Sequence, residues 1–324
     1  MPHRLPHWLI MATLIASPAW AERPSEDVNA HSVESNTSSE STTDNAGSTQ
    51  SDEEPLIEPI PPKALDSRRI DESIAEENPS AFTTFRANYL LPVTYSHHLS
   101  EQHYPDFEDH GLQHTEAKFQ LSFKFKVLDK ALPWDGSLYF AYTQRSWWQV
   151  YNAAASRPFR ETNYQPEAFT SFPNNMTFLG WTNRENRFGF AHQSNGRGNP
   201  LSRSWNYLYV DSIWGRGNWA LSLAPRWRLP ESDEDDDNPD LTQYKGYMDV
   251  GLTYAHNKNE YSLSVFGNPK YNNYGGTLEW SFPLKRKLRG FVQIAAGYGE
   301  SMVDYDLENY RLGFGIQFSS LLGH

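Results

Sequence analysis

The feature that most constrains this fold is a strict alternation of apolar and polar side chains over long stretches. In residues 115–127, TEAKFQLSFKFKV, the side chains from Ala117 onward are alternately apolar and polar. Residues 310–318, YRLGFGIQF, repeat the pattern, with two glycines among the intervening positions. Successive side chains of a β-strand point to opposite faces, so this period predicts strands with one apolar and one polar face.

The first 21 residues have the layout of an export signal. Arg4 gives a positive start, WLIMATLIA an apolar centre, and Ala19-Trp20-Ala21 a cleavage site of small residues before Glu22. An uncleaved membrane anchor is the alternative, but the apolar run is shorter than the roughly 20 residues that a spanning helix needs. We therefore predict a signal peptide over residues 1–21 and an exported protein.

Residues 22–80 form a second zone, which is acidic and rich in Ser, Asn, Thr and Pro. This zone holds 15 acidic and 4 basic residues, a net charge of −11, whereas the whole chain carries −12. With Arg4 contributing +1, residues 81–324 carry about −2. A segment of this composition buries too little apolar surface to offset its chain entropy, so we predict a disordered leader.

Residues 81–324 are predicted to form an all-β domain, either a soluble sandwich or a transmembrane β-barrel. The sandwich explains the alternation, but not its combination with export, long strands, a high aromatic content of 15% and the absence of cysteine. Without disulfides, another device must close the fold. Tryptophan and tyrosine crowd the strand ends, as in the aromatic girdles of membrane barrels. These considerations favour an antiparallel transmembrane β-barrel with an apolar outside.

Twelve strands are predicted, with a thirteenth if residues 177–194 are divided at NREN. Bacterial single-chain barrels have an even number of strands, so we keep this segment whole. With the leader on the periplasmic side, the long loops 96–114, 152–164, 195–202, 229–241 and 299–307 lie outside. The predicted strands are 84–95, 115–127, 137–151, 165–173, 177–194, 203–213, 217–228, 242–256, 259–267, 272–283, 287–298 and 308–320.

The strand that ends in FGFAHQS carries polar groups on its apolar face. His192 and Ser194 follow Phe188 and Phe190 at every second position. The chain returns through SRSWNYLYV, in which Asn206 is also on the outward face. Facing residues of a hairpin lie about 5 Å apart, so the three polar side chains are expected to form one cluster on the lipid-facing wall.

Such a cluster has a chemical use, because polar groups that face lipid are costly. A serine hydroxyl becomes a nucleophile when an imidazole takes its proton, and a third group must fix the tautomer of the imidazole. Asn206 can hold the ring of His192, but a neutral amide stabilises an imidazolium less than a carboxylate does. A His-x-Ser spacing is also frequent by chance, so an incidental cluster is the alternative.

At this point the sequence resembles a known family, the outer membrane phospholipase A family. The resemblance implies a twelve-stranded barrel enzyme of the bacterial outer membrane. It implies a hydrolase of acyl esters in glycerophospholipids and lysophospholipids, dependent on calcium and active as a homodimer. The motifs that carry it are YTQRSWWQ, SRPFRETNY, HQSNGRGNPLSRSWN, NPDLTQYKGY and GYGES.

Carried over residue by residue, the resemblance makes Ser194 the nucleophile, His192 the general base and Asn206 the orienting residue. The backbone N–H of Gly196 matches the oxyanion donor of the family, with the active site at the outer leaflet. No nucleic acid is expected as a partner.

The resemblance also implies one calcium ion per active site, shared across the dimer. Its ligands would be the Arg197 carbonyl, the Ser202 hydroxyl and Ser156 of the partner subunit. Oxygen ligands suit Ca²⁺. Gln144 shares a face with apolar neighbours and points at lipid, where the family uses a glutamine to bond across the dimer interface. A hydrogen bond from Gln144 to a lipid headgroup is the alternative.

Two positions depart from the family pattern. Asn199 stands where the family often has an aspartate that serves a calcium site of the monomer, so that site is in doubt here. Arg157 directly follows Ser156 and places a positive charge beside the expected ion. Two other functions stay open, a lipid A deacylase or acyltransferase and a non-enzymatic porin. The acidic run 231–240 is interpreted as a solvated outer loop, with a divalent cation site as the alternative.

Overall fold

The computed structural model describes residues 64–78, 81–285, 288–319 and 321–322. They belong to one compact unit, Pro59–His324. The predicted signal peptide, and the leader up to residue 63, lie outside the described residues. In the part of the chain that is described, no helix is long and apolar enough to cross a membrane.

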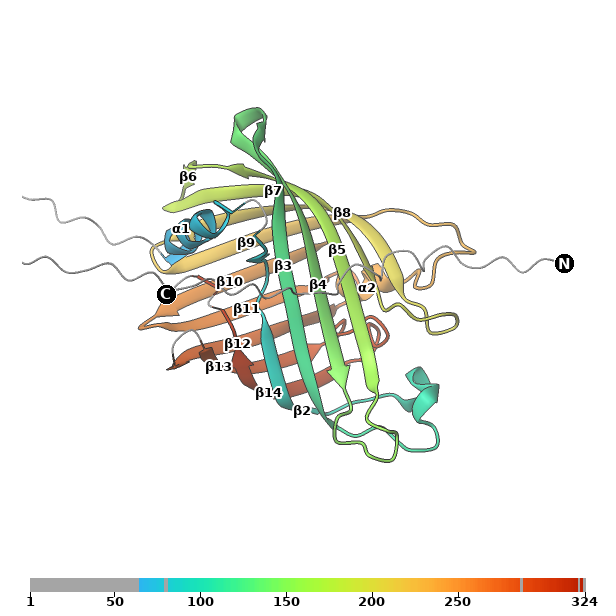
Figure 1. The fold of residues 1–324 in the computed structure, drawn as a ribbon. Coiled ribbons are helices and arrows are strands. Elements are labelled where there is room, and N and C mark those ends of the chain that lie inside the picture. The colour runs from blue at the N-terminus through green and yellow to red at the C-terminus, as the bar shows by residue number, and fades with distance from the viewer. Residues whose placement is uncertain (1–63, 79–80, 286–287, 320, 323–324) are drawn as a thin grey trace, which may run out of the picture. The chain divides into compact units, whose positions relative to one another are not determined.

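Twelve long antiparallel strands form a closed barrel (Figure 1). Consecutive long strands pair with each other around the ring, and β14 closes it by pairing with β2. This confirms the predicted architecture. The strands are β2 (Tyr89–Ser96), β3 (Thr115–Leu132), β4 (Gly136–Trp148), β5 (Phe159–Pro173), β7 (Trp181–Ser194), β8 (Ser204–Arg216), β9 (Trp219–Arg228), β10 (Met248–His256), β11 (Asn259–Asn268), β12 (Asn273–Lys285), β13 (Leu288–Gly297) and β14 (Asn309–Gln317).

One predicted strand, 177–194, is interrupted by a tight turn. The short β6 (Thr177–Phe178) pairs with the start of β7, and the turn between them has positive φ at Leu179 and Gly180. The break thus comes earlier than the NREN position that we considered. The prediction missed it because apolar and aromatic residues continue through the turn. A second short strand, β1 (Thr83–Thr84), pairs with β3.

Four strand boundaries differ from the prediction by five or six residues. Strand β2 begins at Tyr89 rather than at 84, and β3 ends at Leu132 rather than at 127. Strand β5 begins at Phe159 rather than at 165, because its outer end pairs with β4 from Trp148 onward. Strand β10 begins at Met248 rather than at 242, because the short helix α2 (Leu241–Lys245) precedes it and ends at Gly246, which has a φ of 64°.

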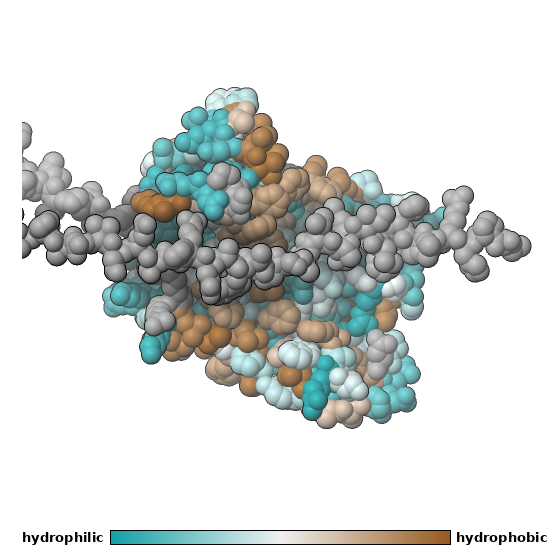
Figure 2. Space-filling model, viewed as in Figure 1, coloured by the Kyte–Doolittle hydropathy of each residue, from teal (hydrophilic) through white to brown (hydrophobic). Residues whose placement is uncertain are grey.

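The barrel is apolar outside and polar inside. On β3, Leu121 is 48% exposed, whereas Lys118 and Lys124 on the other face are only 3% and 4% exposed. On the face shown in Figure 2, hydrophobic side chains gather between two hydrophilic ends. Lipid outside and fixed polar partners inside explain the strict alternation of the sequence.

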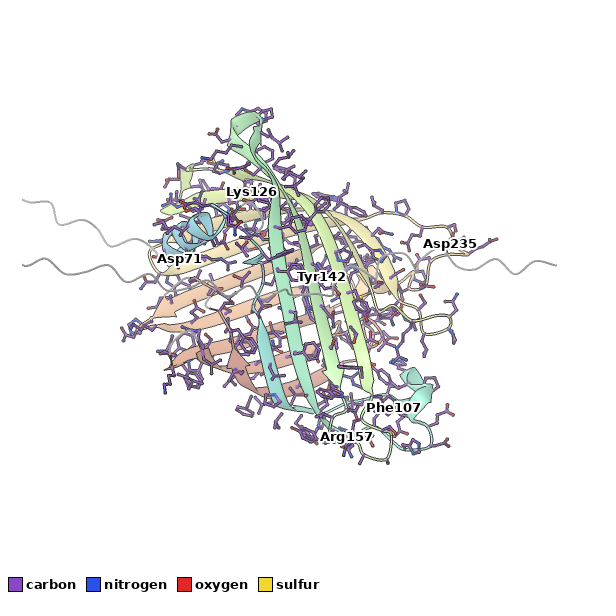
Figure 3. The ribbon with its side chains drawn as sticks, in the orientation of Figure 1. Asp71, Phe107, Lys126, Tyr142, Arg157 and Asp235 are labelled. Atoms are coloured by element: carbon purple, nitrogen blue, oxygen red, sulfur yellow. The ribbon has the colours of Figure 1, made fainter. Side chains whose placement is uncertain are left out.

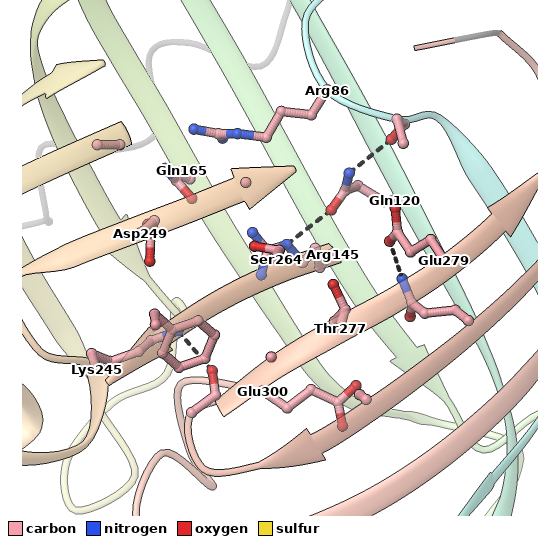
Figure 4. A pocket seen from close by; sticks show the side chains of 18 of the residues that line it. Arg86, Gln120, Arg145, Gln165, Lys245, Asp249, Ser264, Thr277, Glu279 and Glu300 are labelled. Atoms are coloured by element: carbon pink, nitrogen blue, oxygen red, sulfur yellow. Dashed lines mark hydrogen bonds between the residues drawn. The ribbon is translucent and has the colours of Figure 1, made fainter. Parts of the chain in front are cut away.

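Hydrogen bonds join side chains inside the barrel, such as the one from Arg145 to Gln120 at 2.9 Å (Figure 4). Ion pairs also cross the interior. Arg86 pairs with Glu167 at 2.6 Å, and Lys118 pairs with Glu300 at 3.1 Å. A cavity of about 430 Å³ is lined by Arg86, Lys118 and Glu300 among other residues. Several of the inward-facing charges are therefore paired across the barrel interior.

The two ends of the barrel differ in the length of their connections. At one end, the turn end, strands are joined by Pro133–Asp135, 174–180, 217–218 and 257–258. At the other, the loop end, the loops 97–114, 149–158, 195–203, 229–247 and 298–308 are longer, as predicted. Figure 3 shows Phe107, Arg157 and Asp235 at the loop end, Asp71 at the turn end and Tyr142 on the wall between them.

The leader prediction was wrong for residues 64–75, which form helix α1 (Ala64–Ala75) at the turn end. The helix is bound by side chains of the barrel interior. Arg184 donates to Asp66 at 2.9 Å, and Lys124 donates to Glu72 at 3.0 Å. Leu65 packs in an apolar cluster with Ala255 and Leu322. Composition alone could not reveal the helix, because its partners are far away in the sequence.

Candidate active site

His192 and Asn206 face each other across the β7–β8 ladder. They are directly paired in register, and His192 Nδ1 lies 2.9 Å from Asn206 Oδ1. The alternation along β7 continues through this point, with Phe188 51% and Phe190 41% exposed and Ala191 fully buried. Both polar side chains therefore project from the outer wall, near the loop end, as the sequence predicted.

Ser194 ends β7 on the same outward face as His192. It is paired in register with Tyr164 of β5 on one side and with Ser204 of β8 on the other. In this structure, no hydrogen bond joins the Ser194 hydroxyl to the His192 ring. Catalytic hydrogen bonds are often long before substrate binds, and the two side chains are neighbours on one face of one strand.

The loop after the serine begins with a backbone turn at Gly196. Its φ of +67° lies in the left-handed region, and a Cβ at this position would stand 2.9 Å from Cε2 of Tyr164. A side chain is therefore excluded by both conformation and space. Gly196 lies two residues after Ser194, at the position where the resemblance places the oxyanion donor.

Asn195 holds the same loop in place through its buried side chain. Its Oδ1 accepts the backbone N–H groups of Arg197 and Arg203, at 3.3 and 3.0 Å. Its Nδ2 donates to the carbonyl of Leu201 at 2.8 Å. The amide thus links both ends of the loop that carries the expected oxyanion donor and two expected calcium ligands.

Arg197 and Ser202 come from this loop, whereas Ser156 lies on the neighbouring loop 149–158. The guanidinium of Arg197 donates to the carbonyl of Arg160 at 2.6 Å. The Ser202 hydroxyl forms a short hydrogen bond to the carboxylate of Asp237. Ser156 is exposed and has a φ of 59°. Its exposure leaves it accessible to a second copy of the chain.

The donors around Ser202 fit a calcium ion. Within the described ranges, no group of three or more His, Cys, Asp or Glu side chains could hold a metal. The expected set instead uses a hydroxyl and a backbone carbonyl, and the Asp237 carboxylate lies against the hydroxyl. Oxygen-only donors with a nearby negative charge match the preference of Ca²⁺.

Gln144 lies on the outer wall two strands away from Ser194. It is paired in register with the exposed Leu121 and with Tyr164. The Tyr142 hydroxyl donates to its oxygen at 3.0 Å, and its nitrogen donates to Ser146 at 3.1 Å. The outward position of Gln144 agrees with the sequence interpretation.

Sequence reasoning missed the contacts of the acidic loop 231–240. Glu231 accepts a hydrogen bond from Asn206, and Asp237 accepts one from Ser202. Two of its carboxylates are thus bound to expected site residues, so the loop is more than a solvated surface. The only signal was the high acidic density itself, which does not say which carboxylate meets which strand.

Comparison with known proteins decides the family. The family model for phospholipase A1 matches residues 65–318, which include all of α1 except Ala64 and the whole barrel. The chain belongs to the phospholipase A1 family. Phospholipase A1 of Klebsiella pneumoniae is 39% identical over 248 residues, which are 76% of this chain and 85% of that protein. Phospholipase A1 of Escherichia coli K12 is 37% identical over 248 residues, with 76% and 84% covered.

Solved structures of phospholipases give the same answer. Outer membrane phospholipase A from Escherichia coli matches with a TM-score of 0.72 and 35% identity, covering 76% of this chain and 94% of that one. The Salmonella typhi outer membrane phospholipase, solved as a dimer with bound calcium, matches with a TM-score of 0.72 and 35% identity, covering 78% and 97%. The predicted family, twelve-stranded barrel and outer membrane location are thereby confirmed, and the enzyme class is that of the phospholipase A1 family. The roles of the individual site residues stay predictions.

Proposed function

We propose that the chain hydrolyses acyl ester bonds of glycerophospholipids and lysophospholipids at the outer leaflet, with Ser194 as the nucleophile. The observation that carries the proposal is the 2.9 Å contact between His192 and Asn206, on the outward face that also bears Ser194. Reactive groups on the lipid-facing wall can reach an ester at the edge of the bilayer. An asparagine in this role is supported by a structure of the Escherichia coli enzyme with an asparagine-to-alanine change in its active site.

The first half of the reaction forms an acyl-enzyme. The Nδ1–H of His192 donates to Asn206, which leaves Nε2 free. Nε2 takes the hydroxyl proton of Ser194 while the Ser194 Oγ attacks the ester carbonyl. The negative charge passes to the carbonyl oxygen, which the Gly196 N–H stabilises. A donor of this kind is typically worth about 10²–10³ in rate. The ester C–O bond then breaks, and the imidazolium returns its proton to the departing alcohol.

The second half restores the serine. Water takes the place of the alcohol, gives a proton to His192 and attacks the acyl carbonyl. The bond to Ser194 breaks, the serine oxygen regains its proton from the ring, and the fatty acid is released. Asn206 holds the same His192 tautomer throughout both halves.

Calcium and a second copy of the chain complete this proposal. The Arg197 carbonyl and the Ser202 hydroxyl would hold the ion together with Ser156 of the partner subunit, one ion per active site. When bound, calcium would supply positive charge near the developing oxyanion. Gln144, on the outer wall, would bond across the dimer interface. The calcium-bound dimer of the Salmonella typhi enzyme supports this arrangement.

The test is fatty acid release by the purified protein in detergent, from phosphatidylethanolamine and from its lyso form, with Ca²⁺ or with EDTA. Ser194→Ala is expected to lower release by about 10³-fold or more, because the nucleophile is lost. Ser204→Ala, which removes the facing hydroxyl on β8, is the matched control and should stay near the wild-type rate. Full activity of Ser194→Ala refutes the nucleophile, and hydrolysis that EDTA leaves unchanged refutes the calcium requirement.

A further inference from the structure

Glu231 reaches the candidate triad because the β8–β9 ladder continues beyond the end of β9. The backbone N–H of Leu229 donates to the carbonyl of Asn206 at 2.8 Å. Paired residues share a face of the sheet, and the residue two positions further along returns to that face. Asn206 is therefore flanked by His192 on one side and by the start of the acidic loop on the other.

The Glu231 carboxylate is held firmly at this place. Its Oε1 accepts a hydrogen bond from Asn206 Nδ2 at 2.9 Å. Its Oε2 is buried and lies 3.5 Å from the guanidinium of Arg228. That guanidinium is itself fixed, because it donates to Asp236 at 2.5 Å and to the carbonyl of Asn238 at 2.8 Å.

We propose that Glu231 is a positioning residue of the active site, which sets the orientation of Asn206 and through it the tautomer of His192. This inference rests on the proposed catalytic role of Asn206. It extends the chain Ser194, His192, Asn206 by a fourth member, drawn from the acidic outer loop.

The first argument is geometric. An asparagine amide has an oxygen that accepts and a nitrogen that donates, and the two ends are close to interchangeable in shape. An ionised carboxylate only accepts, so Glu231 selects the nitrogen end of Asn206. The oxygen end then faces His192 Nδ1, which must carry the ring proton. Nε2 is left free to accept the proton of Ser194.

The second argument concerns the alternative state. Without Glu231, the side-chain amide of Asn206 can rotate by about 180° and present its nitrogen to the His192 ring. His192 Nδ1 would then accept, the proton would move to Nε2, and the ring could no longer act as a base toward Ser194. In a serine protease, a change that imposes the wrong tautomer lowers kcat by about 10⁴.

The third argument concerns charge. His192 becomes an imidazolium during the reaction, and Asn206 adds no charge of its own. Glu231 brings a negative charge to the far side of the amide, hydrogen-bonded in series with the ring. Hydrogen bonds in series polarise one another, so the carboxylate favours the charged ring. Arg228 offsets part of this effect, at the longer distance of 3.5 Å.

The first experiment compares kcat and KM for Glu231→Ala and Glu231→Gln in the full-length protein with Ca²⁺. Glu231→Ala is expected to lower kcat by about tenfold or more while KM changes less than about twofold, since the bound substrate is not touched. The kcat of Glu231→Gln, which keeps an acceptor oxygen, should lie between those of the wild type and of Glu231→Ala. The matched control is Glu234→Gln, which removes a charge from an exposed position of the same loop. A Glu231→Ala enzyme with the kcat of this control overturns the proposal.

The second experiment exchanges the two groups. Asn206→Asp alone places a carboxylate against that of Glu231, so activity should fall steeply. Adding Glu231→Gln gives the new carboxylate an amide donor, and kcat should recover by about tenfold or more over Asn206→Asp. Tryptophan fluorescence of each variant is measured in parallel and kcat is taken per folded protein, because relief of the repulsion would also restore folding. A double variant no better than Asn206→Asp overturns the proposal.

The two proposals fail in different ways. If Ser194→Ala stays active, the proposed function fails and the role of Glu231 falls with it. If Ser194→Ala is inactive while Glu231→Ala and the exchange behave as their controls, only the positioning role of Glu231 is refuted.

Discussion

Arg160 forms a bidentate ion pair with Glu116 inside the loop end of the barrel. Its Nε and Nη2 atoms lie 2.9 and 2.8 Å from the two carboxylate oxygens, and both side chains are almost fully buried. The same guanidinium donates to Asp304 at 2.8 Å. This network joins β3, β5 and the loop 298–308, and the carbonyl of Arg160 accepts a hydrogen bond from Arg197 of the loop that carries the candidate site.

The first prediction concerns stability. Arg160→Gln leaves the buried Glu116 without its cation and removes one of the two cationic partners of Asp304, and breaking such a buried pair typically costs about 3–5 kcal/mol. We expect a loss of that size in the free energy of unfolding, measured by guanidinium titration of the protein in detergent with tryptophan fluorescence. Arg157→Gln, three residues earlier and exposed, should change it by less than about 0.5 kcal/mol. Equal effects of the two variants would contradict the role of the network.

The second prediction concerns pH. The hydrogen bond to Asp304, at 3.0 Å, raises the pKa of His103 above its ordinary value of 6.5. Burial would raise the pKa of Asp304, but the hydrogen bond from His103 and the Arg160 charge hold it below 3.8. The proton on His103 therefore stabilises the fold below pH 6.5, and this contribution is lost as the pH rises through the raised pKa. The negative charge of Asp306 raises the pKa of His103 further, and the positive charge of Arg203 lowers it.

The measurement is the unfolding free energy of wild type and of His103→Gln between pH 5 and pH 9. The wild type should be more stable than the variant at low pH, and the difference should shrink at high pH. His110→Gln, exposed on the same loop, should show no such trend. A difference that is constant with pH would mean that the proton on His103 contributes nothing.

The strands were predictable because a strand with lipid on one side and a polar interior on the other must alternate apolar and polar side chains. Along β3, apolar side chains such as Leu121 face outward and lysines face inward without exception over ten residues, so the period gave the fold directly. The turn at Leu179 was missed because its backbone conformation leaves no trace in the hydropathy pattern. Helix α1 was missed because its acidic residues are paired by Lys124 and Arg184, which lie more than 50 residues away.

The candidate site divides in the same way. One hairpin carries His192, Ser194 and Asn206. Pairing within a hairpin is local and alternate residues share a face, so the sequence could place the three side chains together. Glu231 comes from a different loop, and its contact with Asn206 depends on how the acidic segment folds back. The sequence alone does not predict such a contact.

The third prediction tests the backbone of the oxyanion loop. Gly196→Ala forces a side chain into a left-handed conformation, which costs roughly 1–2 kcal/mol, and against the ring of Tyr164. The N–H should be displaced, and kcat should fall by between about tenfold and a thousandfold. Gly198→Ala is the control, because a Cβ there meets nothing within 4 Å. Comparable kcat values for the two variants would mean that the Gly196 N–H does not stabilise the oxyanion.

The fourth prediction tests the dimer role of Gln144. Its amide lies on the outer wall beside the exposed Leu121, where apolar surroundings make an interchain hydrogen bond worth about 0.6–2 kcal/mol. Gln144→Ala should therefore weaken dimerisation by roughly three- to thirtyfold in sedimentation equilibrium with Ca²⁺ and a lipid-like inhibitor, and lower activity at low protein concentration only. Tyr261→Phe on β11, on the opposite side of the ring, also removes an outward polar group and should leave dimerisation unchanged. If both variants dimerise as the wild type does, the dimer role of Gln144 is refuted and its hydrogen bond to a lipid headgroup is favoured instead.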